Sequence, residues 1–444
     1  MIASSQRPYS EQIWDPVETW SRDRIEDFQL RALRVQLERV QVRSAFYREK
    51  FREIGFAAAD LKAFADLRRL PITRKADYVA GLEADPPFGS FRAVTVDDAV
   101  RVHFSSGTTG RPVPVLWTKR DVERWTDVYA RYLYAQGLRP TDVFQCMFNY
   151  SWFVGGLGFT LAAERIGALV IPGGSVDTKR QVETIQHYAP KAVAGTPSFM
   201  AHVAETAQDM GVDLARSSVE IVCVGGEPGG SIPGTRQRLE RLWGAKWFDC
   251  YGALECQPIA WDTALQLGPQ IAEDFIFIEI VHPQTLEPVE DGQRGVLVLT
   301  HLDKEACPLV RWWTGDVVVR DCTPTPDGRT HARLVGGVLG RADDMLIVRG
   351  VNLFPTAVED LVRAFPGTTA EYVLVIDDSV KDPQTGFLTG VKLRVERTDD
   401  APPDLEEALA AHLRERLQVR FVVEVLPAGS LPRTVHKAKR VMWE

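Results

Sequence analysis

Short apolar runs that each end in a glycine-rich turn constrain the fold of this chain most strongly. Residues 100–104 (VRVHF) precede SSGTTG, residues 168–171 precede Pro-Gly-Gly, and residues 219–224 precede Gly225 and Gly226. Such runs, alternating with helical segments, are typical of α/β folds with a parallel sheet. Ligands of these folds bind beyond the carboxyl ends of the strands. The glycine turns are therefore candidate binding positions.

The sequence pattern changes towards the C-terminus. Short strand-like segments are expected at 295–300 and 312–320. The last hundred residues then predict helices and strands in alternation: a helix at 355–365, strands at 371–376, 391–395 and 421–426, and a helix at 404–417. We predict a large multi-subdomain α/β body at residues 1–342 and a small mobile α+β lid domain at residues 343–444.

Composition excludes several classes of protein. The formal charge of −8 argues against a nucleic-acid partner, because phosphate contacts need a basic face. No uncharged apolar run reaches the roughly 18 residues of a membrane helix, and the N-terminus has no signal-peptide pattern. The six cysteines are scattered without a CxxC pair, which suits a reducing cytoplasm. We expect a cytoplasmic protein without a membrane partner.

The strongest local motif is a loop rich in hydroxyls and glycines that ends in a cation. Its residues are Ser105, Ser106, Gly107, Thr108, Thr109, Gly110 and Arg111. Glycines let backbone N–H groups converge on an anion, and the hydroxyls and the arginine add hydrogen bonds and charge. The motif suits a polyphosphate, although it is not a Walker A loop. An ordinary surface loop is the alternative when the motif is taken alone.

Five further motifs follow in order, each ambiguous on its own. They are Gly225 to Gly230, Tyr251 to Glu255, Thr314 to Asp316, Gly340 to Gly350, and Pro432 to Lys437. Carboxylates there suit ribose hydroxyls and Mg²⁺, and Tyr251 offers a ring for stacking. Ordinary turns and a solvated terminal lysine explain the same patterns equally well one at a time.

The order and spacing of all six motifs resemble the adenylate-forming superfamily of acyl-CoA synthetases, and within it the phenylacetate–CoA ligase branch. The phosphate loop of that branch reads SSGTTGKP, and here it reads SSGTTGRP. The resemblance extends from residues 13–16 (IWDP), through 118–125 (TKRDVERW) and 153–159 (FVGGLGF), to 340–355 (GRADDMLIVRGVNLFP).

The resemblance implies an ATP-dependent ligase that forms an acyl-AMP and passes the acyl group to CoA, with ATP, Mg²⁺ and CoA as cofactors. Catalytic roles fall to Thr109, Glu255, which would also bind Mg²⁺, and Lys437. The phosphate loop would hold ATP, together with Gly225, Gly226, Glu227, Tyr251, Gly252, Asp316 and Arg341. Asp343 would be the hinge of the lid, and Gly350 would line the CoA tunnel in the second half-reaction.

The residues expected to bind the acid are Tyr150, Trp152, Phe153 and Gly156. Flat apolar rings favour a small aromatic or arylacetic acid over a long alkyl chain. Each ring also fits an ordinary core position. Trp152 replaces the leucine usual in the branch.

Three departures from the family leave alternatives open. Arg111 replaces a lysine, and His436 replaces the glycine before Lys437, which makes Lys439 a rival catalytic cation. Cys256, Cys322 and His331 do not make a tetrahedral zinc set, so we predict no zinc. Delivery to a carrier-protein thiol or an amine, a homodimer, and a catalytically inactive regulator also remain open.

Overall fold

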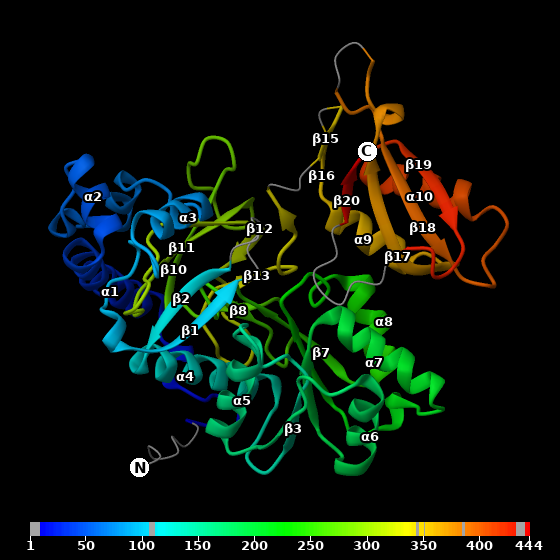
Figure 1. Ribbon diagram of the computed structural model, residues 1–444, viewed down its shortest axis with the longest axis horizontal. Coiled ribbons are helices and arrows are strands. Elements are labelled where there is room, and N and C mark those ends of the chain that lie inside the picture. The colour runs from blue at the N-terminus through cyan, green and yellow to red at the C-terminus, as the bar shows by residue number, and fades with distance from the viewer. Residues whose placement is uncertain (1–8, 106–111, 343–345, 350, 384–386, 432–439) are drawn as a thin grey trace.

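The computed structural model describes residues 9–105, 112–342, 346–349, 351–383, 387–431 and 440–444. In Figure 1 a large body occupies the lower and left part of the view, and a smaller unit stands at the upper right. We call the part up to residue 342 the body and the part from residue 346 the lid. The predicted α/β fold class is confirmed, because helices flank a mixed sheet.

The elements of the body are as follows. Its α-helices are α1 (Arg22–Arg43), α2 (Ala45–Glu53), α3 (Lys75–Ala84), α4 (Lys119–Gln136), α5 (Gly155–Ile166), α6 (Thr178–Tyr188), α7 (Pro197–Asp209) and α8 (Pro233–Trp243). Its strands are β1 (Ala99–Ser105), β2 (Val113–Thr118), β3 (Val143–Cys146), β4 (Leu169–Pro172), β5 (Ala192–Gly195), β6 (Ile221–Gly225), β7 (Lys246–Tyr251), β8 (Ala260–Trp261), β9 (Gln270–Ile271), β10 (Ile276–Val281), β11 (Arg294–His301), β12 (Trp312–Asp321), β13 (Arg333–Leu334) and β14 (Gly340–Arg341).

Among the described residues, one long sheet runs through the body in the order β10-β11-β12-β13-β9-β8-β7-β6-β5-β3-β4, and β14 pairs with β12. Strands β4, β3, β5, β6 and β7 are parallel neighbours. From β8 onward the pairs are antiparallel. The strand-like segments predicted at 295–300 and 312–320 are β11 and β12, and they continue the same sheet.

One predicted strand belongs elsewhere. Strand β1 was expected to feed a glycine turn and then a helix, as in a parallel α/β unit. It instead pairs antiparallel with β2, with Ser105 opposite Val113, so the phosphate-loop motif joins two strands of a ribbon. The run VPVLWT in β2 is buried throughout, which explains why it forms a strand before α4 begins. The ribbon crosses the front of the body in Figure 1.

Helix ends follow local sequence signals. Thr118 and Asp121 form a reciprocal capping box at the start of α4. The same helix ends at Gly137, whose φ of 114° is left-handed and suits glycine. Most of the C-terminal half of α4 is buried, so this capped helix anchors the ribbon to the body.

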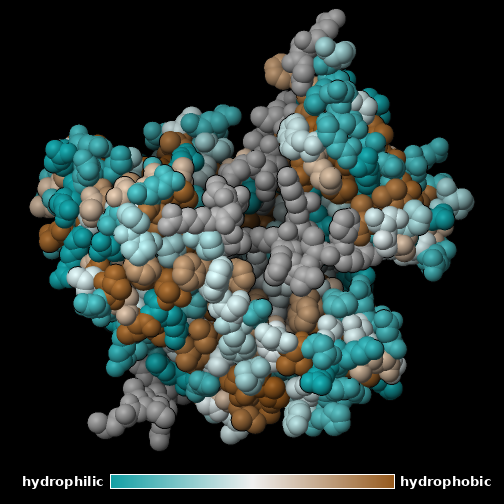
Figure 2. All heavy atoms as spheres, viewed as in Figure 1, coloured by the Kyte–Doolittle hydropathy of each residue, from teal (hydrophilic) through white to brown (hydrophobic). Residues whose placement is uncertain are grey.

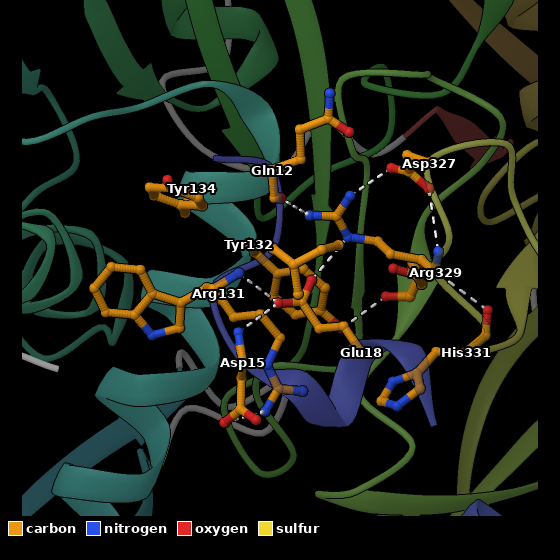
Figure 3. Close-up of polar contacts among 12 residues, drawn as sticks. Gln12, Asp15, Glu18, Arg131, Tyr132, Tyr134, Asp327, Arg329 and His331 are labelled. Carbon is orange, nitrogen blue, oxygen red and sulfur yellow. Dashed lines mark hydrogen bonds and ion pairs between the residues drawn. The ribbon is translucent and has the colours of Figure 1, made fainter. Parts of the chain in front are cut away.

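A buried charge cluster joins the N-terminal segment to the body, as Figure 3 shows. Arg329 Nε donates to Glu18 Oε2 at 2.7 Å, and a second ion pair joins Arg329 to Asp327. Arg329 Nη2 also donates to the carbonyl oxygen of Gln12 at 2.6 Å. The guanidinium therefore has three acceptors in a site that water hardly reaches.

A second buried pair lies in the same region. Arg131 donates two hydrogen bonds to the Asp274 carboxylate, at 2.6 and 2.9 Å. Arg124 Nη2 also contacts Asp274, at 2.5 Å. Burial opposes ionisation, but the two guanidiniums hold the pKa of Asp274 well below its usual value.

The lid has its own sheet and core. Its elements are β15 (Leu346–Val348), β16 (Val351–Leu353), α9 (Pro355–Ala364), β17 (Thr368–Ile376), β18 (Val391–Arg397), α10 (Leu405–Leu417), β19 (Phe421–Leu426) and β20 (Val441–Trp443). The sheet order is β19-β18-β17-β20. Leucines and valines from both helices pack on it in a core separate from that of the body. The helices and strands predicted for this region are confirmed.

Figure 2 shows that the outer surfaces of the lid and of the α1–α3 region are mainly hydrophilic, whereas hydrophobic residues gather lower on the body. In the described part of the chain, no helix is both long and apolar enough to cross a membrane. Five of the six cysteines are buried, all of them in the body, and Cys322 is half-buried.

Candidate functional site

Several predicted residues meet at the carboxyl ends of strands. Tyr251 ends β7, Gly225 ends β6 and Ser105 ends β1. Asp316 reaches the same region from the middle of β12, where it lies directly opposite Arg341 of β14. The candidate site is therefore built from strand ends of the long sheet and from the ribbon.

Tyr251, Asp316 and Arg341 form a connected polar chain. The Tyr251 hydroxyl donates to Asp316 Oδ2 at 2.5 Å, and Arg341 Nη1 lies 3.1 Å from Asp316 Oδ1. Burial, followed by the Asp316 charge, raises the pKa of Tyr251 well above its usual value, so the phenol stays protonated. A carboxylate fixed this way presents acceptors of the kind that vicinal hydroxyls need.

Glu255 is buried and carries a cation on its carboxylate. Its partner is the ammonium of Lys75, the first residue of α3, which also lies 3.4 Å from Ser105 Oγ. The backbone carbonyl of Glu255 accepts from Lys304 Nζ at 3.0 Å, and burial lowers the pKa of Lys304. The Glu255 carboxylate thus already binds one cation, the ammonium of Lys75, which is compatible with its predicted role as a Mg²⁺ ligand.

Lys75 was not predicted as a site residue. It lies 180 positions before Glu255, and one lysine at the start of a helix gives no periodic or motif signal. The available signal was the run Leu70-Pro71-Ile72-Thr73-Arg74 directly before Lys75, in which proline and threonine are typical of a helix start.

Glycines at the neighbouring turns allow close packing of the chain. A side chain at Gly225 would meet the carbonyl oxygen of Cys250 at 2.5 Å, and Gly226 has a φ of 88°. At Gly252 a Cβ would lie 2.9 Å from Gln257 Cγ. The Glu227 carboxylate accepts from the backbone N–H of Ser198 at 2.6 Å, so it lies at the start of α7.

The four predicted acid-binding residues lie in different environments. Tyr150 is half-buried, and its hydroxyl lies 2.6 Å from Thr160 Oγ1. Gly156 is buried, with the Asn149 carbonyl 2.8 Å from where its Cβ would be. Trp152 and Phe153 are 58% and 40% exposed.

Deeper aromatic rings lie close to these four. Phe148, Phe159 and Trp261 stack in sequence, with 5.0 Å between neighbouring ring centroids. Phe148 also lies under Gly155, where a Cβ would meet its ring at 3.1 Å. Sequence reasoning did not single out this buried stack, because its members come from three separate segments.

Comparison with known families decides the assignment. The model of the AMP-binding enzyme family matches residues 25–301, and the model of the AMP-binding enzyme C-terminal domain matches residues 350–443. The chain belongs to the AMP-binding enzyme family. The family predicted from the motifs is confirmed.

Curated relatives cover nearly the whole chain. Phenylacetate-coenzyme A ligase of Aromatoleum evansii is 36% identical, with 96% of both chains covered. The enzyme of the same name from Thermus thermophilus is 35% identical, with 96% of this chain and 98% of the relative covered. The predicted phenylacetate–CoA ligase branch is confirmed.

Solved structures of a 2-hydroxyisobutyryl-CoA ligase match in different degrees. Its postadenylation state with 2-HIB-AMP gives a TM-score of 0.92 at 29% identity, covering 99% of this chain and 94% of that one. Its thioesterification state with 2-HIB-AMP and CoA gives 0.75 at 30% identity over the same shares. Because one enzyme gives both values, the difference reflects domain arrangement. The arrangement of body and lid here agrees better with that enzyme's postadenylation structure than with its thioesterification structure.

Some predicted residues of this family member lie outside the described residues. They are Ser106, Gly107, Thr108, Thr109, Gly110, Arg111, Asp343, Gly350, Lys437 and the rival Lys439. Ser105 and Arg341, at the edges of these segments, are described and face the site as given above.

The residues considered for zinc serve other contacts. His331 Nδ1 lies 3.1 Å from the carbonyl oxygen of Ile271, and its Nε2 lies 3.0 Å from that of Val17. Cys256 is fully buried beside Glu255, and burial raises the pKa of its thiol. Both ring nitrogens of His331 are thus directed at backbone carbonyls.

Proposed function

We propose that this chain is an ATP-dependent carboxylic acid–CoA ligase that activates an aromatic or arylacetic acid as an acyl-AMP. The phenylacetate-coenzyme A ligases aligned along nearly the whole chain support this class of reaction. The observation that carries the proposal is the joint placement of Tyr251, Asp316, Arg341 and Glu255 at one end of the sheet.

In the first half-reaction an oxygen of the acid attacks the α-phosphorus of ATP, the bond to the β-phosphate breaks, and pyrophosphate leaves. Asp316 and Arg341 hold the ribose, Tyr251 stacks on the adenine beside Gly225, Gly226, Glu227 and Gly252, and the loop 105–111 holds the phosphates with Thr109. Glu255 would hold Mg²⁺, which would stabilise negative charge on the phosphate oxygens.

Lys75 supplies a second cation to this charge balance. Its ammonium contacts both Glu255 and Ser105, the first residue of the phosphate loop. A lysine is a mobile point charge, so it can turn from the carboxylate to the polyphosphate when both metal and nucleotide enter. Before the ligands enter, Lys75 compensates the charge of Glu255. After it turns, Lys75 adds positive charge at the leaving pyrophosphate.

In the second half-reaction the CoA sulfur attacks the acyl carbon, and the bond to AMP breaks. We propose that the lid, residues 343–444, rotates about Asp343 between the two steps. Lys437 acts in the first step, and Gly350 lines the pantetheine path in the second. The acid lies against Tyr150, Trp152, Phe153 and Gly156 of the body.

Several finer assignments belong to the same proposal. The acceptor is CoA, with a carrier-protein thiol or an amine as the alternative, and the enzyme acts in the cytoplasm. The exposed Trp152 and the Phe104 ring, whose centroids are 5.3 Å apart, offer apolar surface where a CoA or carrier arm could enter.

Acid-dependent ATP–pyrophosphate exchange tests the first half-reaction. A panel of benzoic and arylacetic acids should give exchange, and CoA, carrier proteins and amines are then compared as acceptors. No exchange with any acid would overturn the proposal in favour of an inactive regulator.

The terminal cation needs its own comparison. Lys437→Ala should abolish adenylate formation while sparing thiolysis of a supplied acyl-AMP. The same result with Lys439→Ala instead would move the assignment to Lys439.

A further inference from the structure

Helix α8 of the body begins without a capping side chain of its own. Its N-cap residue Ile232 makes no side-chain hydrogen bond, and Pro233 occupies the first turn. The first N–H groups of a helix have no partner within the helix, and they carry partial positive charge. This end of α8 faces the lid, where α9 lies directly above it in Figure 1.

The lid supplies the missing cap. Asp360 of α9 accepts a hydrogen bond from the backbone N–H of Gly234 at 2.7 Å. Gly234 also provides the room: a Cβ there would lie 2.9 Å from Asp360 Oδ1 and 3.3 Å from the Ala364 Cβ. A carboxylate at a helix N-terminus combines a hydrogen bond with a favourable helix dipole.

Two arginines support the same contact, one from each side. Arg238 of α8 donates to the carbonyl oxygen of Thr369 in the lid at 3.2 Å. Arg363 of α9 reaches the Thr235 hydroxyl of α8 at 3.4 Å. Arg363 also pairs with Glu359 at 2.8 Å, which compensates its charge inside the contact. We call Asp360, Arg238 and Arg363 the lid latch.

The latch belongs to one lid orientation. The arrangement of body and lid agrees with the postadenylation state of 2-hydroxyisobutyryl-CoA ligase at a TM-score of 0.92, and with its thioesterification state at 0.75. A contact at 2.7 Å between two rigid helices does not survive a large rotation of one of them.

We propose that Asp360 is a positioning residue that caps α8 only while the lid holds the adenylate-bound orientation, and that its release precedes the thiol step. This inference rests on the proposed two-step function. Loss of a side-chain N-cap lowers the equilibrium constant that favours the capped state by about fivefold. Removal of Asp360 should therefore raise the ratio of the CoA-competent orientation to the adenylate-bound orientation by about fivefold.

Hydrogen exchange at Gly234 tests the contact itself, using the full-length enzyme. Asp360→Ala should speed exchange of the Gly234 amide about fivefold, and Asp360→Asn, which keeps an acceptor, should leave it near the wild-type rate. Asp378→Ala is the matched control, because Asp378 is a lid carboxylate that is 99% exposed and whose ion pair, within the described part of the chain, is with Lys381. An unchanged Gly234 rate in Asp360→Ala overturns the latch.

Half-reaction kinetics test its role. With preformed acyl adenylate and CoA below saturation, Asp360→Ala should thiolyse about fivefold faster than wild type, with a lower KM for CoA and an unchanged kcat. A general folding defect would slow both half-reactions instead. Thiolysis that is unchanged or slower overturns the proposal.

A variant on the body side gives an independent check. Gly234→Ala introduces a Cβ into the space of Asp360, so it should reproduce the faster thiolysis, and the double variant should add nothing further. Additive effects would overturn a shared latch. Hydrogen exchange at the Gly234 amide does not depend on catalysis. If the wild-type enzyme showed no ATP–pyrophosphate exchange, the proposed function would be refuted, but the hydrogen-exchange test of the latch could still be interpreted.

Discussion

Two sets of ion pairs in the body consist of similar residue types but differ in how far solvent reaches their cations. In the buried set, the Arg329 and Glu18 side chains are 2% and 3% exposed. At the proposed nucleotide site, the Glu255 and Asp316 side chains are 9% and 13% exposed, but their partners Lys75 and Arg341 are 43% and 44% exposed. A pair in which the cation reaches solvent can exchange partners when an anionic ligand arrives.

The two sets differ in how completely the partners of each cation satisfy its hydrogen bonds and charge. Arg329 is held by two carboxylates and a carbonyl oxygen, so no incoming group can improve its position. Lys75 bridges a carboxylate and a hydroxyl at the open side of the site. The comparison predicts that substitutions in the buried set reduce stability, and that substitutions at the site reduce catalysis.

The largest effect is expected for Arg329→Met. It leaves Glu18 and Asp327 as uncompensated buried charges, so the free energy of unfolding should fall by about 3–5 kcal/mol. Urea denaturation measures this loss. Arg52→Met is the control, because Arg52 pairs with Glu49 on the surface and should change stability by less than about 1 kcal/mol. Equal losses in the two variants would contradict the comparison.

Lys75→Met should mainly reduce catalysis rather than stability. We expect adenylate formation to fall about 10²-fold, the typical effect of removing one preorganised group that stabilises developing charge. The free energy of unfolding should fall by less than in Arg329→Met, because the Lys75 side chain is 43% exposed and solvent reaches one side of the pair. Pyrophosphate exchange and urea denaturation together check this, with Lys50→Met of the exposed Lys50–Glu53 pair as control. A large loss of stability with normal exchange would place Lys75 in the scaffold.

Asp316→Ala should weaken ATP binding and leave the acid almost unaffected. Loss of a charged hydrogen-bond acceptor costs about 1.5–3 kcal/mol, so KM for ATP should rise roughly 10- to 100-fold. Tyr251→Phe, which keeps the ring and removes only the hydroxyl on Asp316, should have a smaller effect. Equal increases in the KM values for ATP and acid would contradict a ribose contact.

The smallest effect is expected from mild acid. The folded pKa of Asp274 lies below its unfolded value of about 3.9, so its stabilisation is complete above that value and disappears as the pH falls towards the folded pKa. The stability difference between wild type and Asp274→Asn should thus be constant from pH 7 to 5 and shrink near pH 3. Urea denaturation at these pH values measures it. Shrinkage already at pH 5 would contradict the depressed pKa.

Local patterns predicted the elements of this fold better than their pairing. The lid elements and the strand before Gly225 follow from apolar patterning, which depends on neighbours in the sequence. The prediction that a helix follows β1 and its glycine turn was wrong, because a glycine-rich turn is compatible with a following strand or a following helix. Only the buried run in β2 decides between them.

The ion pairs that were not predicted from the sequence join segments that lie far apart along the chain. Tyr251, Asp316 and Arg341 were predicted because family motifs carry them, and they lie together. Lys75 and Glu255 are 180 positions apart, and Glu18 and Arg329 are 311 apart, without any motif that links them. Such pairs depend on how the sheet and the N-terminal segment close on each other.

The distribution of thiols in this chain makes the lid convenient to observe. The lid sequence contains no cysteine, five of the six in the body are buried, and partial burial raises the pKa of Cys322 to about 11. Maleimides and similar reagents attack thiolates, so they should react slowly with the natural chain. A cysteine introduced on the outer face of α10 would accept a spectroscopic label selectively, and lid rotation could then be followed in real time without first stripping the protein of its own cysteines.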